Sequence, residues 1–377
     1  MTTPRRIVFL TGTRADFGKL KPLMLATQQC PDTEVHVFAT GMHMNPKYGR
    51  TVEEVQKCGF DNVFMYHNHF DYYAMDMILA RTIEGFSYFV KDLRPDLIVL
   101  HGDRVETLAG AIVGALNNVV TAHVEGGECS GTIDDSLRHA VSKLCHLHFV
   151  SNHEARDRLM RMGEPSERIF AIGSPDVDVM VGGQLPSLDQ VRAHYEIPFD
   201  EYGVLLFHPV TTELDTLARQ ARELVDAVLA SDRQYVVIYP NNDHGTDLIF
   251  AEYARLEGNP RFRLFPSVRF ESFLVLLRES QFIIGNSSAG LMEAPYLGVP
   301  AINVGTRQQQ RARGSGVLDC PADRTALLGA IARCSQLDVT AVHPFGDGRS
   351  AERFVAVLQD DRLWRVDAQK SFWDLAA

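Results

Sequence analysis

The sequence predicts an α/β protein of two doubly wound, Rossmann-like domains with a cleft between them. Short apolar runs typical of buried strands alternate with helical segments along the chain. This alternation stops at the Gly- and Pro-containing stretch 182–187 and then starts again. In both halves, glycines and polar residues follow directly after the predicted strands, where open parallel sheets bind ligands. A chain of 377 residues is long enough for two domains of ~100 to 200 residues.

The predicted first domain is centred on a strand–helix–strand unit. Apolar residues 96–100 run into His101-Gly-Asp-Arg, a helix is expected over 106–117, and a second apolar run ends at Val124. The other elements expected in this half are strands at 7–10, 34–40 and 169–172 and helices around 137–144 and 152–162.

The second half repeats the alternation. Here we expect strands at 204–207, 235–239, 282–284 and 301–304 and a helix over 214–229.

Composition excludes several classes of protein. A net charge of −11 argues against nucleic acid as the main partner, and no apolar run approaches the ~20 residues that span a bilayer. The six cysteines lack CxxC spacing, as expected of reduced thiols in a cytoplasmic protein. The pairs His67/His69 and His146/His148 have no third ligand at a suitable spacing, so we expect no metal.

Several carboxylates follow the strands of the first half. Asp103 and Glu125 end buried strands and have no helix to cap, so their desolvation favours a functional role or a charged partner. Asp134 and Asp135 precede a helix, and capping alone would explain either of them. Taken together, these acids are expected in one cleft.

A second group of residues suits an anionic ligand. In the first half, Arg14 and Lys19 put positive charge beside a helix start, although this loop has neither GxGxxG nor a P-loop pattern. In the second half, residues 286–293 are expected to open a helix whose N–H groups and serine hydroxyls bind a diphosphate. Helix capping by Ser287 or Ser288 is the simpler interpretation and is compatible with that role.

Seven segments together resemble the UDP-N-acetylglucosamine 2-epimerase family, most closely its hydrolysing branch. They are GTRADFGKLKPL (12–23), HGDR (101–104), HVEGGECSGTIDDSLRHA (123–140), HPVTTE (208–213), PNNDHG (240–245), GNSSAGLMEA (285–294) and GTRQ (305–308). The resemblance covers nearly the whole chain.

The resemblance implies a GT-B-like fold. Its domains would be residues 1–180 and a nucleotide-binding domain at 188–360, with a C-terminal helix at 361–377 packing back on the first through Trp364, Phe372 and Trp373. It also implies that UDP-N-acetylglucosamine loses UDP by elimination to a glycal. Water then adds to give N-acetylmannosamine for sialic-acid-type biosynthesis, with no cofactor.

The resemblance also implies roles for particular residues. Asp103, Glu125 and Asp134 match the family's functional acids and His208 its cleft histidine, while Arg14, Ser287, Ser288, Glu293 and Arg307 match positions that hold uridine diphosphate. Our hypothesis gives the ring proton to Asp103 and Glu125 and hydration to Asp134. The further substrate-binding residues expected are Asp16, Lys19, His43, Arg104, Asp135, Arg138, Asn241 and Gly290.

Alternative functions stay open at this point. One alternative is the same chemistry on a UDP- or GDP-linked 2,4-diacetamido-2,4,6-trideoxy sugar. Parts of the sequence pattern are also shared by three other classes of protein: a GT-B glycosyltransferase, a non-hydrolysing epimerase and a nucleotide-sugar sensor. We expect a homo-oligomer, a dimer or tetramer, in which apolar stretches such as 72–90 pack between subunits.

Overall fold

The computed structural model describes residues 4–68, 74–182, 185–309, 316–334, 336–337, 339–341, 345–371 and 373–374. The chain divides into two compact units. The N-terminal unit comprises Met1–Glu128, Asp134–Gly183 and Pro344–Ala377, and the C-terminal unit comprises Cys129–Ile133 and Gln184–His343. The last segment of the chain therefore belongs to the N-terminal unit from about residue 344, earlier than the boundary at 360 that we expected.

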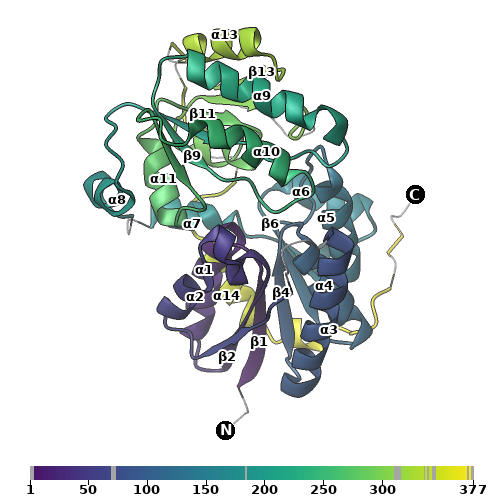
Figure 1. The fold of residues 1–377 in the computed structure, drawn as a ribbon. Helices are drawn as coiled ribbons and strands as arrows, with labels where there is room; N and C mark the ends of the chain where they lie inside the picture. Colours follow the sequence, from purple (N-terminus) through teal and green to yellow (C-terminus); the bar gives the residue numbers. More distant parts are fainter. Residues whose placement is uncertain are drawn as a thin grey trace. The chain divides into compact units, whose positions relative to one another are not determined.

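The N-terminal unit contains a seven-stranded parallel sheet in the order β3-β2-β1-β4-β5-β6-β7 (Figure 1). Its strands are β1 (Arg5–Thr11), β2 (Thr33–Ala39), β3 (Asn62–Met65), β4 (Leu97–His101), β5 (Thr121–Val124), β6 (Leu147–Val150) and β7 (Ile169–Ala171). Its helices are α1 (Arg14–Gln28), α2 (Val52–Lys57), α3 (Met75–Leu93), α4 (Val105–Leu116), α5 (Ile133–Leu144), α6 (His153–Arg161), α7 (Pro175–Val181) and α14 (Ser350–Leu358).

Strand β1 shows how the sheet is covered on both faces. Ile7 and Phe9 pack with residues of α1 and α14, whereas Val8 and Leu10 pack with residues of α3, α4 and α5. Successive side chains of a strand point to opposite faces, so a strand between two helix layers must be apolar at every position. This is why the strands appear in the sequence as continuous apolar runs.

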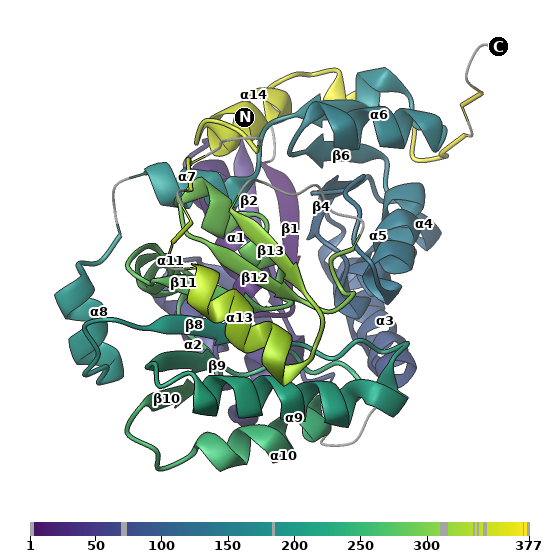
Figure 2. The same cartoon turned by 90° about the horizontal axis from the view of Figure 1, so that it is seen from above.

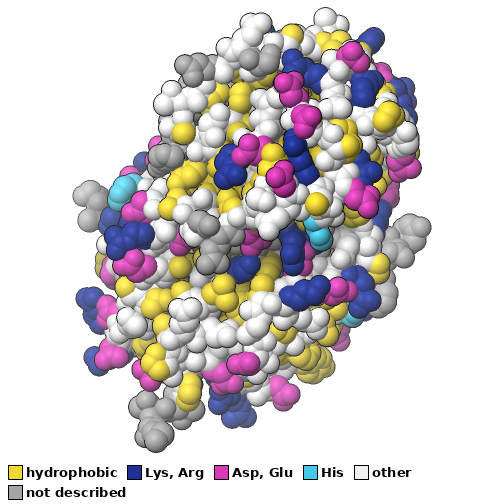
Figure 3. Space-filling view, turned by 90° about the vertical axis from the view of Figure 1, so that its left-hand side faces the viewer, with side chains coloured by type: hydrophobic (Ala, Val, Ile, Leu, Met, Phe, Trp, Pro, Cys, Tyr) yellow, Lys and Arg dark blue, Asp and Glu magenta, His cyan; other side chains and the backbone are white. Residues whose placement is uncertain are grey.

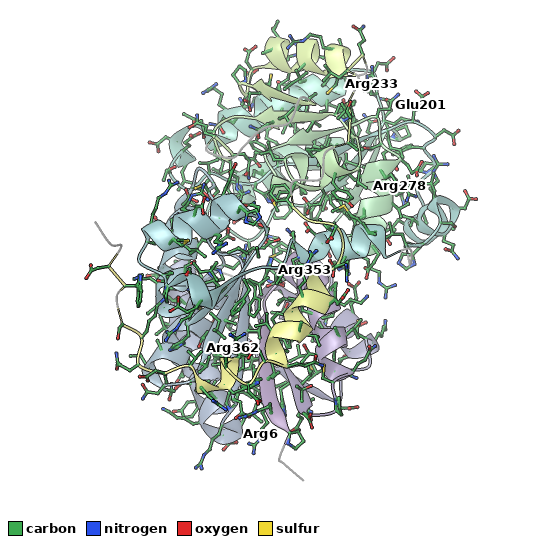
Figure 4. The ribbon with its side chains drawn as sticks, turned by 180° about the vertical axis from the view of Figure 1, so that it is seen from behind. Arg6, Glu201, Arg233, Arg278, Arg353 and Arg362 are labelled. Atoms are coloured by element: carbon green, nitrogen blue, oxygen red, sulfur yellow. The ribbon has the colours of Figure 1, made fainter. Side chains whose placement is uncertain are left out.

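The helix that returns to the N-terminal unit is α14, not a helix over 361–377. It packs against α1 and α7, and Arg353 of α14 donates to the carbonyl of Ile172 at 3.0 Å (Figure 4). Among the described residues after α14, the one helical element is a 3-10 turn, η6 (Leu363–Arg365), in which the ring centroid of Trp364 lies 4.7 Å from the Arg5 guanidinium. Trp373 is 54% exposed, and Phe372 lies outside the described residues.

The C-terminal unit contains a six-stranded parallel sheet in the order β10-β9-β8-β11-β12-β13. Its strands are β8 (Gly203–Leu206), β9 (Tyr235–Ile238), β10 (Phe262–Phe265), β11 (Phe282–Gly285), β12 (Ala301–Val304) and β13 (Val317–Cys320). Its helices are α8 (Leu188–Tyr195), α9 (Leu214–Ala230), α10 (Thr246–Tyr253), α11 (Phe270–Arg278), α12 (Glu293–Tyr296) and α13 (Arg324–Cys334). Figure 2 shows α13 across one face of this sheet with α9 beside it.

The six strands of the C-terminal sheet have the same order as the first six of the N-terminal sheet, which has β7 as an additional edge strand. In both sheets the strand order reverses between two central strands. These strands are β1 and β4 in one unit and β8 and β11 in the other. In doubly wound sheets the crevice at such a switch point, beyond the carboxyl ends of the strands, is the usual ligand site. The loops that follow β4, β8 and β11 contain Asp103, His208 and Ser288, three of the residues singled out in the sequence.

Two further findings concern possible partners. No described helix is long and apolar enough to cross a membrane. On the face shown in Figure 3, acidic and basic side chains are interspersed rather than gathered by sign.

Candidate functional site

Glu125 follows β5 in the N-terminal unit, and three other segments hold its carboxylate. His101 Nε2 lies 3.0 Å and Lys19 Nζ 3.5 Å from Oε2, while the Ser174 hydroxyl donates to Oε1. Burial alone would raise the pKa of Glu125, but Lys19 and the His101 ring outweigh it and hold the pKa well below its usual range. The side chain is therefore a fixed, ionised carboxylate.

The backbone of Glu125 is also unusual. Its φ of +61° lies in the left-handed region, which costs a non-glycine residue roughly 1–3 kcal/mol. The amide N–H of Glu125 donates to the carbonyl of Phe149 at 2.9 Å, so the strained conformation is tied to the neighbouring strand β6. The left-handed turn ends β5 abruptly and directs the carboxylate beyond the sheet edge.

Lys19, on α1, links Glu125 to a second buried carboxylate. Its Nζ lies 3.2 Å from Asp176 Oδ2 at the start of α7, in addition to its contact with Glu125. No role was predicted from the sequence for His101, Ser174 or Asp176. The signal that was available for Ser174 and Asp176 is the Gly-Ser-Pro-Asp segment directly after β7, a polar strand end like the others.

Asp103 and Asp135 are brought together by Arg138. Arg138 is buried; one of its terminal nitrogens binds Asp103, and the other lies 3.2 Å from Asp135 Oδ1 and donates to the Glu128 carbonyl. Asp103 follows β4, whereas Asp135 and Arg138 come from α5. A planar guanidinium between two carboxylates sets both in a defined orientation.

Asp134 and Asp135 do not precede α5 as caps, because the helix already begins at Ile133. Both lie in its first turn, where a negative charge is favoured by the helix dipole. Asp134 is half-buried and precedes Asp135, which pairs with Arg138.

The loop after β1 is held by Asp16. This residue accepts from the N–H groups of Gly12 at 2.9 Å and Thr13 at 3.0 Å and from the Thr11 hydroxyl at 2.6 Å, and with Thr13 it forms the capping box of α1. Its carboxylate thus shapes the loop that presents Arg14. The Arg14 guanidinium is paired with Glu54 on α2.

His43 belongs to the same buried network. Its Nε2 lies 2.9 Å from the Thr11 hydroxyl and its Nδ1 2.6 Å from that of Thr51, and burial lowers its pKa to about 4. The neutral ring is fully enclosed and joins the ends of β1 and β2. This geometry supports a positioning role for His43 and Asp16, rather than direct contact with a ligand.

Arg104 begins α4 at its N-cap, and its Nε lies 3.5 Å from Glu106. The Glu106 carboxylate is buried against Gly12 and Gly41, where an added Cβ would crowd it. Glu106 therefore fills the space between the loops that follow β1 and β2, next to the β1/β4 switch point. It was not predicted from the sequence.

His208 follows β8 in the C-terminal unit and is surrounded by amides. The N–H of Asn241, after β9, donates to His208 Nδ1 at 3.0 Å, and the Asn241 side chain binds Asp243. Asn286, after β11, contacts the backbone of His208. The switch point of this sheet is thus lined by one imidazole and several amides.

The segment after β11 is not the continuous helix that we expected. It forms a 3-10 turn, η5 (Ser288–Gly290), followed by the four-residue α12 that starts at Glu293. Ser287 caps η5 by accepting from Ala289 N–H at 3.3 Å, as the simpler interpretation stated. So short a helix has little dipole, and the N–H groups and hydroxyls of the turn itself are the groups suited to a phosphate.

The loop after β12 is anchored by the HPVTTE segment. Glu213 accepts hydrogen bonds from the Thr306 hydroxyl and, at 2.9 Å, from Gln220 Nε2. Arg307, which follows Thr306, is half-buried, and its Nη1 lies 3.4 Å from the Asn286 carbonyl. Glu213 therefore has a structural role that its position in the motif did not disclose.

No group of three or more His, Cys, Asp or Glu side chains in the described part of the chain could hold a metal ion.

Two units of this topology define a GT-B-like α/β protein, with acids at the switch point of one unit and hydrogen-bond donors at that of the other. Residues 25–359 match the family described as UDP-N-acetylglucosamine 2-epimerase. The chain belongs to this family.

Named relatives agree with this assignment. The chain is 45% identical over 98% of its length to "UDP-N-acetylglucosamine 2-epimerase" of Neisseria meningitidis serogroup B, of which 99% is covered. It is 32% identical over 94% of its length to "UDP-N,N'-diacetylbacillosamine 2-epimerase (hydrolyzing)" of Legionella pneumophila, of which 96% is covered. Among solved structures, the Methanocaldococcus jannaschii UDP-GlcNAc 2-epimerase in complex with UDP-GlcNAc and UDP has a TM-score of 0.80 at 20% identity, covering 94% of this chain and 99% of that one, which shows the shared fold.

Proposed function

We propose that this protein is a hydrolysing nucleotide-sugar 2-epimerase that converts UDP-N-acetylglucosamine and water into N-acetylmannosamine and UDP for sialic-acid-type biosynthesis. The observation that carries the proposal is the group of acids at one sheet edge: Glu125 held ionised by Lys19 and His101, and Asp103 held by Arg138. The relative at 45% identity supports the choice of substrate.

The acids suit a reaction that both removes and adds a proton. In the first step a base takes the hydrogen from C2 of the sugar while the C1–O bond to the diphosphate breaks, which leaves a C1–C2 double bond and UDP. In the second step water supplies OH to C1 and a proton returns to C2 from the opposite face. Groups with different protonation preferences suit the two steps. We assign the ring proton to Asp103 and Glu125 and the hydration step to Asp134.

The departing diphosphate needs positive charge and hydrogen-bond donors. Arg14, Ser287, Ser288 and Arg307 supply these groups, which stabilise charge that builds up on the leaving oxygen. Buried Glu293 is proposed to bind the ribose hydroxyls.

The assay is release of free sugar and UDP from UDP-N-acetylglucosamine in D2O. We expect deuterium at C2 of the product, and we expect Asp103→Asn, Glu125→Gln and Asp134→Asn each to lower kcat by roughly 100-fold or more. Full turnover by the Asp103→Asn variant would reject the assignment of that residue. Recovery of an intact UDP-sugar epimer would identify a non-hydrolysing enzyme, and a requirement for an acceptor would identify a glycosyltransferase.

A second substrate class has specific support. Relatives named as acting on UDP- or GDP-linked N,N'-diacetylbacillosamine are 32% and 29% identical to this chain. A panel of UDP- and GDP-linked sugars with and without the second acetamido group would decide between the substrates by their kcat/KM values.

We also propose that the enzyme acts in the cytoplasm as an oligomer of identical subunits. On α3, Met77 and the 71% exposed Tyr88 lie about three helical turns apart on one face, and Phe64 and Met65 of the edge strand β3 are also exposed. Exposed apolar side chains of this kind support an interface with a second copy of the chain. Light scattering of the wild type and of a Tyr88→Glu variant tests this, and a wild-type monomer would refute it.

A further inference from the structure

Asn286, the first residue after β11, uses its side chain to clamp the backbone of His208. Asn286 Oδ1 accepts from the His208 N–H at 2.6 Å, and Asn286 Nδ2 donates to the His208 carbonyl at 2.8 Å. The amide is 1% exposed, so water does not compete for these two hydrogen bonds. A shift or rotation of the His208 backbone would break at least one of them.

Gly285 allows this clamp to form. Its φ is +140°, and a Cβ at this position would collide with the carbonyl oxygen of Leu206 in β8. With glycine there, β11 continues close against β8, and Asn286 N–H donates to the Leu206 carbonyl at 3.2 Å. The asparagine side chain then meets His208 across the switch point.

The imidazole of His208 is held from another strand. Its Nδ1 accepts from the backbone N–H of Asn241 at 3.0 Å, so a neutral ring has its proton on Nε2. The backbone of His208 is thus held by the residue after β11, and its ring by a residue after β9. Together these contacts determine where Nε2–H points.

The main chain of Asn286 has a different set of partners. Its carbonyl accepts from Gln308 Nε2 at 3.0 Å and from Arg307 Nη1 at 3.4 Å, both after β12. A substitution of Asn286 removes the side-chain clamp on His208 but leaves the carbonyl that Arg307 and Gln308 use. The two roles can therefore be separated by mutation.

We propose that Asn286 is a positioning residue for the reaction, which acts through His208 by fixing its backbone at the β8/β11 switch point. This inference rests on the proposed function, in which His208 takes part in catalysis. It predicts that loss of the side chain lowers turnover and leaves binding of the nucleotide largely intact.

The kinetic test compares Asn286→Ala with Asn303→Ala. Asn303 is a matched control: it is 4% exposed, lies on β12 of the same sheet and donates to Asp319 Oδ1 at 2.7 Å. We expect Asn286→Ala to lower kcat by roughly 100-fold with little change in KM or in the Kd for UDP, because displacement of a reacting group by about 1 Å costs that much. Asn303→Ala should retain the wild-type kcat. A kcat loss in Asn286→Ala no larger than in Asn303→Ala would overturn the proposal.

Two further variants test the route through His208. Asn286→Asp keeps the size of the side chain but puts an oxygen opposite the His208 carbonyl, so it should lose kcat as Asn286→Ala does, with the fold retained by circular dichroism. In a His208→Gln background, Asn286→Ala should cause no further loss of kcat. Additive losses would show that Asn286 does not act through His208.

A spectroscopic measurement separates this proposal from the proposed function. Long-range 1H–15N spectra of histidine-labelled protein, with His208 assigned by the His208→Gln variant, should show the Nε2–H tautomer in the wild type. In Asn286→Ala the His208 ring resonances should shift, because a displaced backbone moves the ring relative to the Asn241 N–H. If the wild type releases no sugar from any nucleotide sugar, the proposed function fails, while this spectrum still tests the clamp. An unchanged spectrum in Asn286→Ala refutes the clamp whatever the wild-type activity.

Discussion

Glu164 should account for a large part of the acid sensitivity of the N-terminal unit. Its carboxylate is fully buried and has three partners: Lys143 Nζ at 2.9 Å, Lys370 Nζ at 2.7 Å and His148 Nε2 at 3.0 Å. Burial would raise its pKa, but the hydrogen bond from His148 and the charge of Lys370 lower it to about 2, from an ordinary 4.5. The contact with Lys370 also ties the C-terminal segment to α5, because this lysine donates to the carbonyls of Ser142 and Cys145.

The magnitude follows from the pKa difference between the folded and unfolded states. A depression from 4.5 to about 2 corresponds to roughly 3 kcal/mol of stability at neutral pH. A carboxyl with a lowered folded pKa contributes this stability fully above its unfolded pKa and loses it as the pH falls toward the folded value. The Glu164→Gln variant should therefore be about 3 kcal/mol less stable than the wild type at pH 7, and this difference should shrink as the pH falls from 4.5 to about 2.

The assay is urea unfolding followed by tryptophan fluorescence between pH 7 and pH 3. Both tryptophans, Trp364 and Trp373, lie in the C-terminal segment of the N-terminal unit, so their fluorescence reports that unit. Glu352→Gln is the matched control, because this acid forms an exposed ion pair with Arg349, which should contribute little. A stability difference between the wild type and Glu164→Gln that is absent at pH 7, or equal at pH 7 and pH 3, would refute the reasoning.

Three other predictions follow from the two switch points. Gly285→Ala should destabilise the C-terminal unit by at least about 3 kcal/mol in thermal unfolding, because the new Cβ strains the backbone at positive φ and collides with the Leu206 carbonyl. Gly329→Ala, at a helix position of α13 with open space around it, should instead stabilise the unit by ~0.5–1 kcal/mol. Equal effects of the two substitutions would contradict the packing argument. Lys19→Met removes the cation that lowers the pKa of Glu125, so the acid limb of the kcat/KM profile should move to higher pH, and an unmoved limb would count against Glu125 as the titrating group. Arg138→Lys keeps the charge but loses the planar bridge between two acids, and kcat should fall at least about tenfold; wild-type turnover would show that the bridge is dispensable.

Much of the local structure could be predicted from the residues alone. Strand β12 was expected at 301–304 and lies at Ala301–Val304, and helix α4 was expected at 106–117 and lies at Val105–Leu116. Parallel strands buried on both faces form continuous apolar runs, so their positions are visible without any knowledge of their neighbours. The capping box of Thr13 and Asp16 was not predicted, because we interpreted Asp16 as a ligand-binding acid.

The errors have physical causes. The family resemblance implied a returning helix at 361–377, but the helix is α14, whose Phe354 and Leu358 join the core. Trp364 packs against the same core, as expected, but from a 3-10 turn. The helix expected after Ser287 stops after one turn, before the short α12 that contains Pro295. In both cases the pattern of residue types was compatible with more than one local structure.

The sequence by itself determined the alternation of strands and helices, the placing of polar residues at strand ends and the family, since these depend on residue types and their order. Only the tertiary structure decided which strand ends are neighbours, and hence that Lys19, His101 and Ser174 meet at Glu125 and that Asn286 meets His208. The physical reason is that the ionisation of a buried carboxylate and the orientation of an imidazole depend on atoms within about 3 to 4 Å, and those atoms come from segments far apart in the chain.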